Sequence, residues 1–139
     1  MSLFVDTSAW YAAADAGDID HARARAVLSR GEALVTTDHI LVESWMLLRV
    51  RRDRHAADTF WRTLREGAAR IESTTPADLE VAWRIGEDYP DQDFSLVDRT
   101  SFAAMMRLGI TRAASFDSDF AVFRYGASKA MAFEVLRQV

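Results

Sequence analysis

Short apolar runs alternate along the chain with longer segments in which apolar residues recur every three to four positions. The short runs are typical of buried strands, and we expect strands at 3–5, 33–35, 70–73, 112–116 and, at the sheet edge, 131–136. The longer segments have the period of amphipathic helices, which we expect over 21–30, 38–52, 57–66, 76–86 and 95–108. Strands separated by helices predict an α/β fold with a parallel sheet of about five strands, flanked by helices.

Residues at the ends of these segments support their boundaries. Gly31, Gly67 and Gly109 follow predicted helices, where glycine commonly ends the last turn. Pro76 suits a first helical position, and Ser95 suits an N-cap. The sequence contains no repeat, low-complexity tract or linker, so we expect one domain over residues 1–139.

The composition narrows the class of protein. The 139 residues include 21 acids, 17 bases and no cysteine, with a formal net charge of −4. The lack of cysteine excludes disulfides, thiolate metal ligands and cysteine nucleophiles. Mild acidity disfavours nucleic-acid binding through overall charge but allows a local basic patch. The N-terminus does not resemble a signal peptide and no apolar stretch is long enough to cross a membrane, so we expect a cytoplasmic protein.

Four acids occupy positions at which α/β proteins place functional groups. Asp6 and Asp117 follow predicted strands, and function collects at the carboxyl ends of strands in such sheets. Glu43 shares a largely apolar helix face, and Asp98 lies in the first turn of its helix. Each acid also has a structural interpretation: a turn or helix cap at Asp6 and Asp117, a capping box at Asp98, and a salt bridge at Glu43.

Considered together, the four carboxylates predict a cation site. Carboxylates that converge in one pocket repel one another unless a cation neutralises them. Oxygen ligands without cysteine favour Mg²⁺ or Mn²⁺ over Zn²⁺. Sites of this kind act on phosphate esters, because the metal activates water and stabilises the charge on the phosphate. Spacing along the chain leaves open whether the four acids converge.

The motifs that carry these acids resemble the PIN domain and, more closely, the VapC toxins of bacterial toxin–antitoxin pairs. The motifs are, in order, Phe4-Val5-Asp6-Thr7-Ser8-Ala9, Glu43 in the helix after the second strand, Ser95-Leu96-Val97-Asp98, and Ser115-Phe116-Asp117-Ser118-Asp119-Phe120. Each motif is weak alone, but the ordered set spans essentially the whole chain and is specific. The resemblance implies a PIN-like endoribonuclease that requires Mg²⁺ or Mn²⁺ and acts as a toxin by cutting RNA and inhibiting translation.

The resemblance also implies roles for individual residues. The family's catalytic, metal-binding acids fall on four positions of this sequence: Asp6, Glu43, Asp98 and Asp117. Asp119 matches a position that is often acidic and assists through water. Thr7 or Ser8 matches a hydroxyl that hydrogen-bonds within the site. Arg99 stands where small residues are common in the family, and the resemblance assigns it no role.

The partners implied by the resemblance are an RNA substrate, a VapB-type antitoxin and a second copy of the chain. Transfer RNA and ribosomal RNA both fit the family as targets. The antitoxin would insert its C-terminal segment into the active site. The alternative is a catalytically inactive PIN-like domain that binds RNA or another protein, and the presence of all four acids argues against it.

The densest run of positive charge follows Glu43 on the same predicted helix. Its arginines are Arg49, Arg51, Arg52 and Arg54. One interpretation is a solvated helix end, where cations complement the helix dipole. The other is a rim that contacts RNA phosphates, because six residues of helix place Arg49 roughly 9 Å from Glu43.

The tryptophans are predicted to lie in the core. They are Trp10, Trp45, Trp61 and Trp83. Because Trp45 and Trp61 lie on consecutive helices, an alternative is that they line a groove for a partner helix.

Overall fold

The computed structural model describes residues 1–137 and contains a five-stranded parallel sheet. In spatial order its strands are β3 (Arg70–Glu72), β2 (Ala33–Thr37), β1 (Ser2–Val5), β4 (Arg112–Ala114) and β7 (Glu134–Leu136). Every neighbouring pair in this sheet is parallel, which confirms the predicted sheet. Because the strands are parallel, their carboxyl ends meet along one edge, where β1 and β4 are adjacent.

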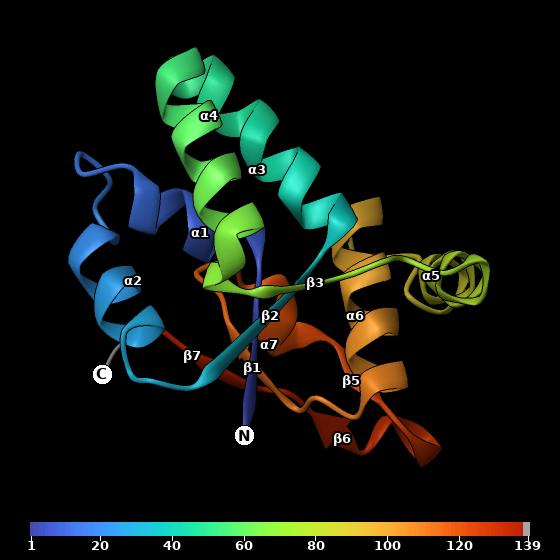
Figure 1. The fold of residues 1–139 in the computed structure, drawn as a ribbon. Coiled ribbons are helices and arrows are strands. Elements are labelled where there is room, and N and C mark those ends of the chain that lie inside the picture. The colour runs from blue at the N-terminus through green and yellow to red at the C-terminus, as the bar shows by residue number, and fades with distance from the viewer. Residues whose placement is uncertain (138–139) are drawn as a thin grey trace.

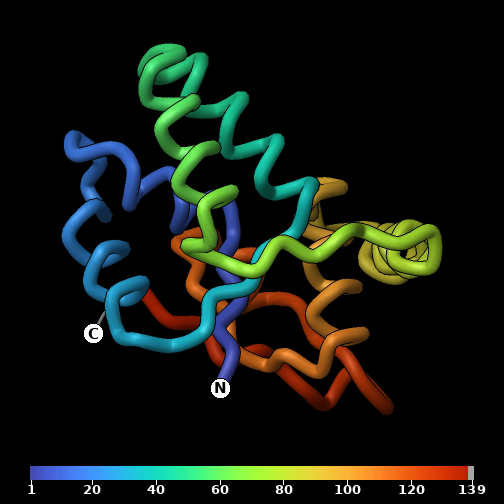
Figure 2. The backbone as a smooth tube through the Cα atoms, viewed as in Figure 1, coloured from blue at the N-terminus to red at the C-terminus, as the bar shows by residue number. Residues whose placement is uncertain are grey.

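Helices connect the strands and surround the sheet (Figure 1). They are α1 (Thr7–Ala14), α2 (His21–Leu28), α3 (Asp38–Arg51), α4 (Arg54–Thr63), α5 (Pro76–Asp88), α6 (Leu96–Leu108) and the short α7 (Asp119–Val122). A π-helical turn, Leu64–Ala68, extends α4, and a 3-10 turn, Ala127–Lys129, lies between two short antiparallel strands, β5 (Arg124–Tyr125) and β6 (Met131–Ala132). Figure 2 shows α3 and α4 as a hairpin, with α1 and α2 to one side of the strands and α5 and α6 to the other.

Two elements differ from the sequence-based expectation. Helix α1 was not expected, because residues 9–12 are all buried and apolar or aromatic and therefore lack the polar face that reveals a helix by its period. The expected strand over 131–136 divides into β6, which pairs with β5, and β7, which forms the sheet edge beside β4.

The tryptophan prediction is only partly confirmed. Trp10 is buried in the core, and Trp45 and Trp61 pack against it while partly exposed. The prediction was wrong for Trp83, whose residue surface is 64% exposed on α5. The i, i+4 spacing of Leu79 and Trp83 marks an apolar stripe, but this stripe faces away from the core.

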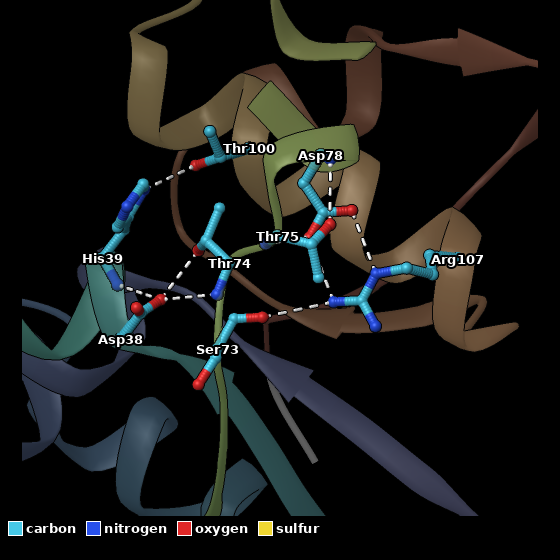
Figure 3. A network of polar contacts seen from close by, with 8 residues as sticks. All are labelled: Asp38, His39, Ser73, Thr74, Thr75, Asp78, Thr100 and Arg107. Carbon is cyan, nitrogen blue, oxygen red and sulfur yellow. Dashed lines mark hydrogen bonds and ion pairs between the residues drawn. The ribbon is translucent and has the colours of Figure 1, made fainter. Parts of the chain in front are cut away.

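A polar network fixes the helices that carry Glu43 and Asp98 (Figure 3). Asp38, at the start of α3, accepts hydrogen bonds from the Thr74 backbone N–H (2.9 Å) and hydroxyl (2.7 Å). Asp78 closes the capping box of α5 and also pairs with Arg107 of α6 at 3.0 Å. Thr74 thus fastens the segment before α5 to α3, and Asp78 fastens the first turn of α5 to α6, which together hold α3 and α6 in a fixed relation.

Candidate active site

A cavity of about 510 Å³ opens at the carboxyl ends of β1 and β4, between α3 and α6. All four acids predicted for the site line it, together with four further acids. The acidic lining residues are Asp6, Asp18, Asp20, Glu43, Asp93, Asp98, Asp117 and Asp119. Within residues 1–137, Arg51 is the only base that lines this cavity. The structure therefore brings the predicted acids together in a strongly negative pocket.

Asp6 is buried where β1 passes into α1. Its carboxylate accepts hydrogen bonds from the Ser8 backbone N–H, from the Ser8 hydroxyl at 3.2 Å and from the Ser115 hydroxyl. The first of these bonds caps α1, so the capping interpretation and membership of the cavity hold together. Burial raises the pKa of Asp6 to about 6, and the nearby charge of Asp117 adds to the shift.

Three carboxylates lie close together among the described residues. Asp98, Asp117 and Asp119 each offer an oxygen within 4.8 Å of the others. Asp98 also closes a capping box with Ser95, whose backbone N–H lies 3.3 Å from Asp98 Oδ2. The Asp119 backbone N–H donates to Asp117 Oδ1 at 2.9 Å, which holds the two residues in one turn.

The electrostatics of this cluster favour a bound cation. Burial is the main cause that raises the pKa of Asp98, and a hydrogen bond with Asp119 and repulsion from Asp117 and Asp6 raise it further. Burial and repulsion from Asp117 also raise the pKa of Asp119. Without a cation, protons must partly neutralise the cluster. An all-oxygen, all-carboxylate donor set fits a hard divalent cation, so the residues present fit the metal expected from the sequence.

The hydroxyls beside Asp6 orient the acids. Thr7 Oγ1 donates to Glu43 Oε1 at 2.6 Å, which links α1 to α3 across the cavity. Ser8 Oγ accepts from the Phe116 backbone N–H at 2.9 Å, which ties α1 to the chain after β4. Glu43 makes no ion pair with an arginine among the described residues, which removes the structural alternative for that acid.

The structure separates the four arginines of the predicted RNA-contacting run. Arg51 lines the cavity, and its guanidinium lies over the Tyr11 ring, 5.2 Å from the centroid. Arg52 pairs with Asp15 at 3.4 Å and Arg54 pairs with Asp58 at 3.3 Å, both outside the cavity. Arg49 is exposed and does not line the cavity.

Arg99 points away from the cluster. Its Nε donates to the Phe94 carbonyl at 3.1 Å, and its guanidinium lies where a side chain at position 86 of α5 would be. Gly86 thus leaves the room that Arg99 occupies. The side chain fastens the start of α6 to α5, and Asp98 is in that first turn.

Sequence reasoning missed Ser115 and three acids that also line the cavity, Asp18, Asp20 and Asp93. Ser115 donates to Asp6 and accepts from the Asp117 backbone N–H at 3.1 Å, so it joins two of the predicted acids. Its signal was its position, since it immediately precedes Phe116 and Asp117 at the end of β4. Asp18 and Asp20 lie in a turn that folds back onto the cavity, and their spacing contains no sign of this.

The family of this chain follows from a comparison with models of known protein families. The model described as the PIN domain matches residues 3–124. This chain belongs to the PIN-domain family. It is 39% identical to the 23S rRNA-specific endonuclease VapC20 of Mycobacterium tuberculosis over 120 residues, covering 85% of this chain and 91% of VapC20. It is 32% identical over 97 residues to the ribonuclease VapC26 of the same organism, covering 69% and 72% of the two chains.

A solved structure supports the same assignment. The crystal structure of Mycobacterium tuberculosis VapC20, described as a toxin that cleaves the sarcin–ricin loop, superposes on this PIN domain with a TM-score of 0.78. The two sequences are 38% identical, and the match covers 84% of this chain and 91% of VapC20.

These relatives confirm a VapC-type PIN toxin with the activity of an RNA-hydrolysing enzyme, and they do not favour the catalytically inactive alternative. PIN nucleases generally use a divalent metal, and the cluster of Asp98, Asp117 and Asp119 suits one. Within residues 1–137 no helix is both long and apolar enough to span a bilayer.

Proposed function

We propose that this PIN-domain chain is a Mg²⁺- or Mn²⁺-dependent endoribonuclease and the toxin of a VapBC-type pair, acting in the cytoplasm as one domain over residues 1–139. One observation carries the proposal: an acidic trio with raised pKa values for Asp98 and Asp119 lies in a cavity with Asp6 and Glu43. The oxygen-only donor set suits these two ions.

The roles follow from the positions of the carboxylates. Asp98, Asp117 and Asp119 would hold the cation, and Asp6 and Glu43 would complete the site directly or through water. A bound divalent cation activates water for attack on a phosphodiester and offsets the charge of the reacting phosphate. Thr7 fixes one oxygen of Glu43, which positions that carboxylate to orient the attacking water. Attack by water leaves a 3′-hydroxyl and a 5′-phosphate.

The relatives favour ribosomal RNA over transfer RNA as the target. VapC20 is named as a 23S rRNA-specific endonuclease, and this chain covers 91% of it at 39% identity. Since the match extends over 85% of this chain, we propose a loop of ribosomal RNA as the substrate. Transfer RNA is the second candidate, which the resemblance to VapC toxins also allows.

The proposed activity is tested with the purified protein and total RNA. We expect site-specific cleavage with Mg²⁺ or Mn²⁺, no cleavage with EDTA, and recovery when the metal is restored. Sequencing of the RNA ends identifies the target and the 5′-phosphate. Metal-independent cleavage, or tight metal binding by calorimetry without any cleavage, would contradict the proposal.

Arg51 is proposed to contact a phosphate of the bound RNA, because no other cationic side chain in the described part of the chain lines the cavity. In an Asp98→Asn background, Arg51→Gln should weaken single-stranded RNA binding and reduce the slope of log K against log salt by about 0.7. Arg54→Gln is the matched control, because Arg54 pairs with Asp58 and does not line the cavity. Equal slopes for the two variants would show that the run is only a solvated helix end.

A homodimer through α3 is part of the proposal. Val42, Met46 and Val50 form a stripe on α3 that is 48%, 57% and 81% exposed, an apolar surface that a second copy would cover. The helix carries Asp38 near its start and Arg49 near its end, so two copies packed antiparallel bring opposite charges together. A VapB-type antitoxin is the further partner, as the resemblance implies, and the groove that Trp45 and Trp61 line with Val42 and Asp58 is a candidate surface.

Met46→Glu should convert the dimer to a monomer of 15.6 kDa. The substitution buries two carboxylates against each other at the centre of the stripe, which is costly without a counter-ion. Light scattering after size exclusion measures the mass. Met131→Glu, at a methionine of similar exposure on β6, is the control and should leave the mass unchanged. A wild-type monomer at micromolar concentration would refute this interface.

A further inference from the structure

Two aromatic rings line the acidic cavity, and they differ in access. The Tyr11 residue is only 7% exposed, and its hydroxyl is already used in a hydrogen bond to Asp15 at 2.6 Å. Phe116 is partly exposed and lines the cavity beside Asp117. Among the residues that line the cavity, Phe116 therefore presents the aromatic ring that a ligand can reach.

A backbone hydrogen bond positions Phe116 next to the acids. The Phe116 N–H donates to the Ser8 hydroxyl at 2.9 Å. The residue before it, Ser115, donates to Asp6, and the residue after it, Asp117, belongs to the acidic trio. A group stacked on Phe116 would thus lie in the same cavity as the carboxylates.

The wall beside Phe116 carries planar and polar groups. The Arg23 guanidinium of α2 lies over the ring, 5.8 Å from the centroid. Arg23 is also paired with Asp20, which lines the cavity. A ring, a guanidinium plane and a carboxylate together are the kinds of groups that proteins use to hold an unstacked nucleobase, by stacking and by hydrogen bonds to its edge.

We propose that Phe116 is a substrate-binding residue that stacks one of the two nucleobases flanking the scissile phosphate, with Arg23 extending the stacking surface. The inference rests on the proposed function, because the ligand is the RNA strand that is cut. It adds a binding subsite for a base to a site otherwise composed of acids. The ring itself is tolerant of base identity, and the Asp20 carboxylate is the group that can accept a hydrogen bond from the edge of the base.

The test pairs removal of the ring with removal of the base. Cleavage by wild type and Phe116→Leu is measured on an oligonucleotide that contains the mapped target, and on two versions with an abasic nucleotide on either side of the cut. We expect Phe116→Leu to raise KM on intact RNA by about tenfold with a smaller change in kcat. One abasic position should raise the wild-type KM by a similar factor and have no further effect on Phe116→Leu.

Two more variants distinguish stacking from a purely structural role. Phe116→Tyr keeps an aromatic ring and should therefore have the wild-type KM, in contrast to Phe116→Leu. Arg23→Lys keeps the charge but loses the plane, at a side chain that is 50% exposed, and should raise KM several-fold on intact RNA only. If Phe116→Leu lowers the melting temperature, Phe116→Tyr and Arg23→Lys still decide the question on intact and abasic RNA.

The outcomes separate this inference from the proposed function. If the wild type cleaves RNA and is stopped by EDTA, but the increases in KM from removal of the ring and removal of the base multiply, then the stacking role is wrong and the proposed function stands. The same holds if Phe116→Leu has the wild-type KM. A wild type that cleaves no RNA with either metal would overturn both proposals.

Discussion

Asp98→Asn is expected to reduce the rate of RNA cleavage by at least about a hundredfold while the fold is retained. The variant removes one of the charges that would hold the cation, yet an asparagine oxygen can still accept from the Ser95 N–H and keep the capping box of α6. Asp119→Asn should lose a comparable factor. The structure places Asp119 within the same 4.8 Å cluster as Asp98 and Asp117, whereas the sequence supported only an auxiliary role.

The measurement is the single-turnover cleavage rate with saturating Mn²⁺, accompanied by circular dichroism. Asp91→Asn is the matched control, because Asp91 is an exposed acid in the same part of the chain and does not line the cavity. If Asp119→Asn cleaves RNA at a rate within a few-fold of wild type, Asp119 is not a ligand of the cation and has at most an auxiliary role. Full activity of Asp98→Asn would refute the assignment of the site.

In EDTA, the wild-type protein should lose stability as the pH rises through the range in which Asp6 ionises. Its pKa is raised from 3.8 to about 6, so the folded state binds this proton more tightly than the unfolded state. The stabilisation is fully present below pH 4 and is lost as the pH rises towards the folded-state pKa of about 6. The shift corresponds to about 3 kcal/mol, and the raised pKa of Asp98 adds in the same direction.

Comparison with Asp6→Asn isolates this effect from other carboxylates. Asp38 and Asp78 have lowered pKa values, so the stability that they contribute is lost as the pH falls. Both residues are present in wild type and in Asp6→Asn, so their contribution cancels in the comparison. The free energy of unfolding from urea denaturation should be similar for the two proteins at pH 4 and higher for Asp6→Asn at pH 7.5. Adding Mn²⁺ at pH 7.5 should stabilise wild type more. A difference between the variants that does not change with pH would contradict the prediction.

The sequence predicted most of the fold because the strands are short apolar runs with clear stops. Helix α1 escaped prediction because residues 9–12 have no polar face, so no period marks them. At the site, Asp6 and Asp98 had been given structural or functional interpretations as alternatives. The structure confirms the capping interpretation for both, and this does not exclude the functional one, since one oxygen of each carboxylate takes part in helix capping while the residue lines the cavity.

The features of the site that the sequence did not predict depend on where loops and long side chains lie in the folded protein. The four arginines follow closely on one another in the sequence, yet among them Arg51 alone lines the cavity, since Arg52 pairs with Asp15 just after α1 and Arg54 pairs with Asp58 on its own helix, α4. The return of Asp18 and Asp20 to the cavity depends on the turn between α1 and α2. Neither property is encoded in local periodicity.

Asp6 and Asp98 take part in helix capping and also line the acidic cavity. This combination constrains how the protein can evolve into an inactive relative. Replacement of Asp6 by alanine removes the N-cap of α1, at a cost of about 1 kcal/mol, and replacement of Asp98 by alanine removes its capping-box bond to Ser95; each also removes the charge. Replacement by asparagine removes the charge and keeps the cap. Lineages that retain the domain for binding after losing nuclease activity should therefore reach that state through asparagine at these positions more often than through small apolar residues.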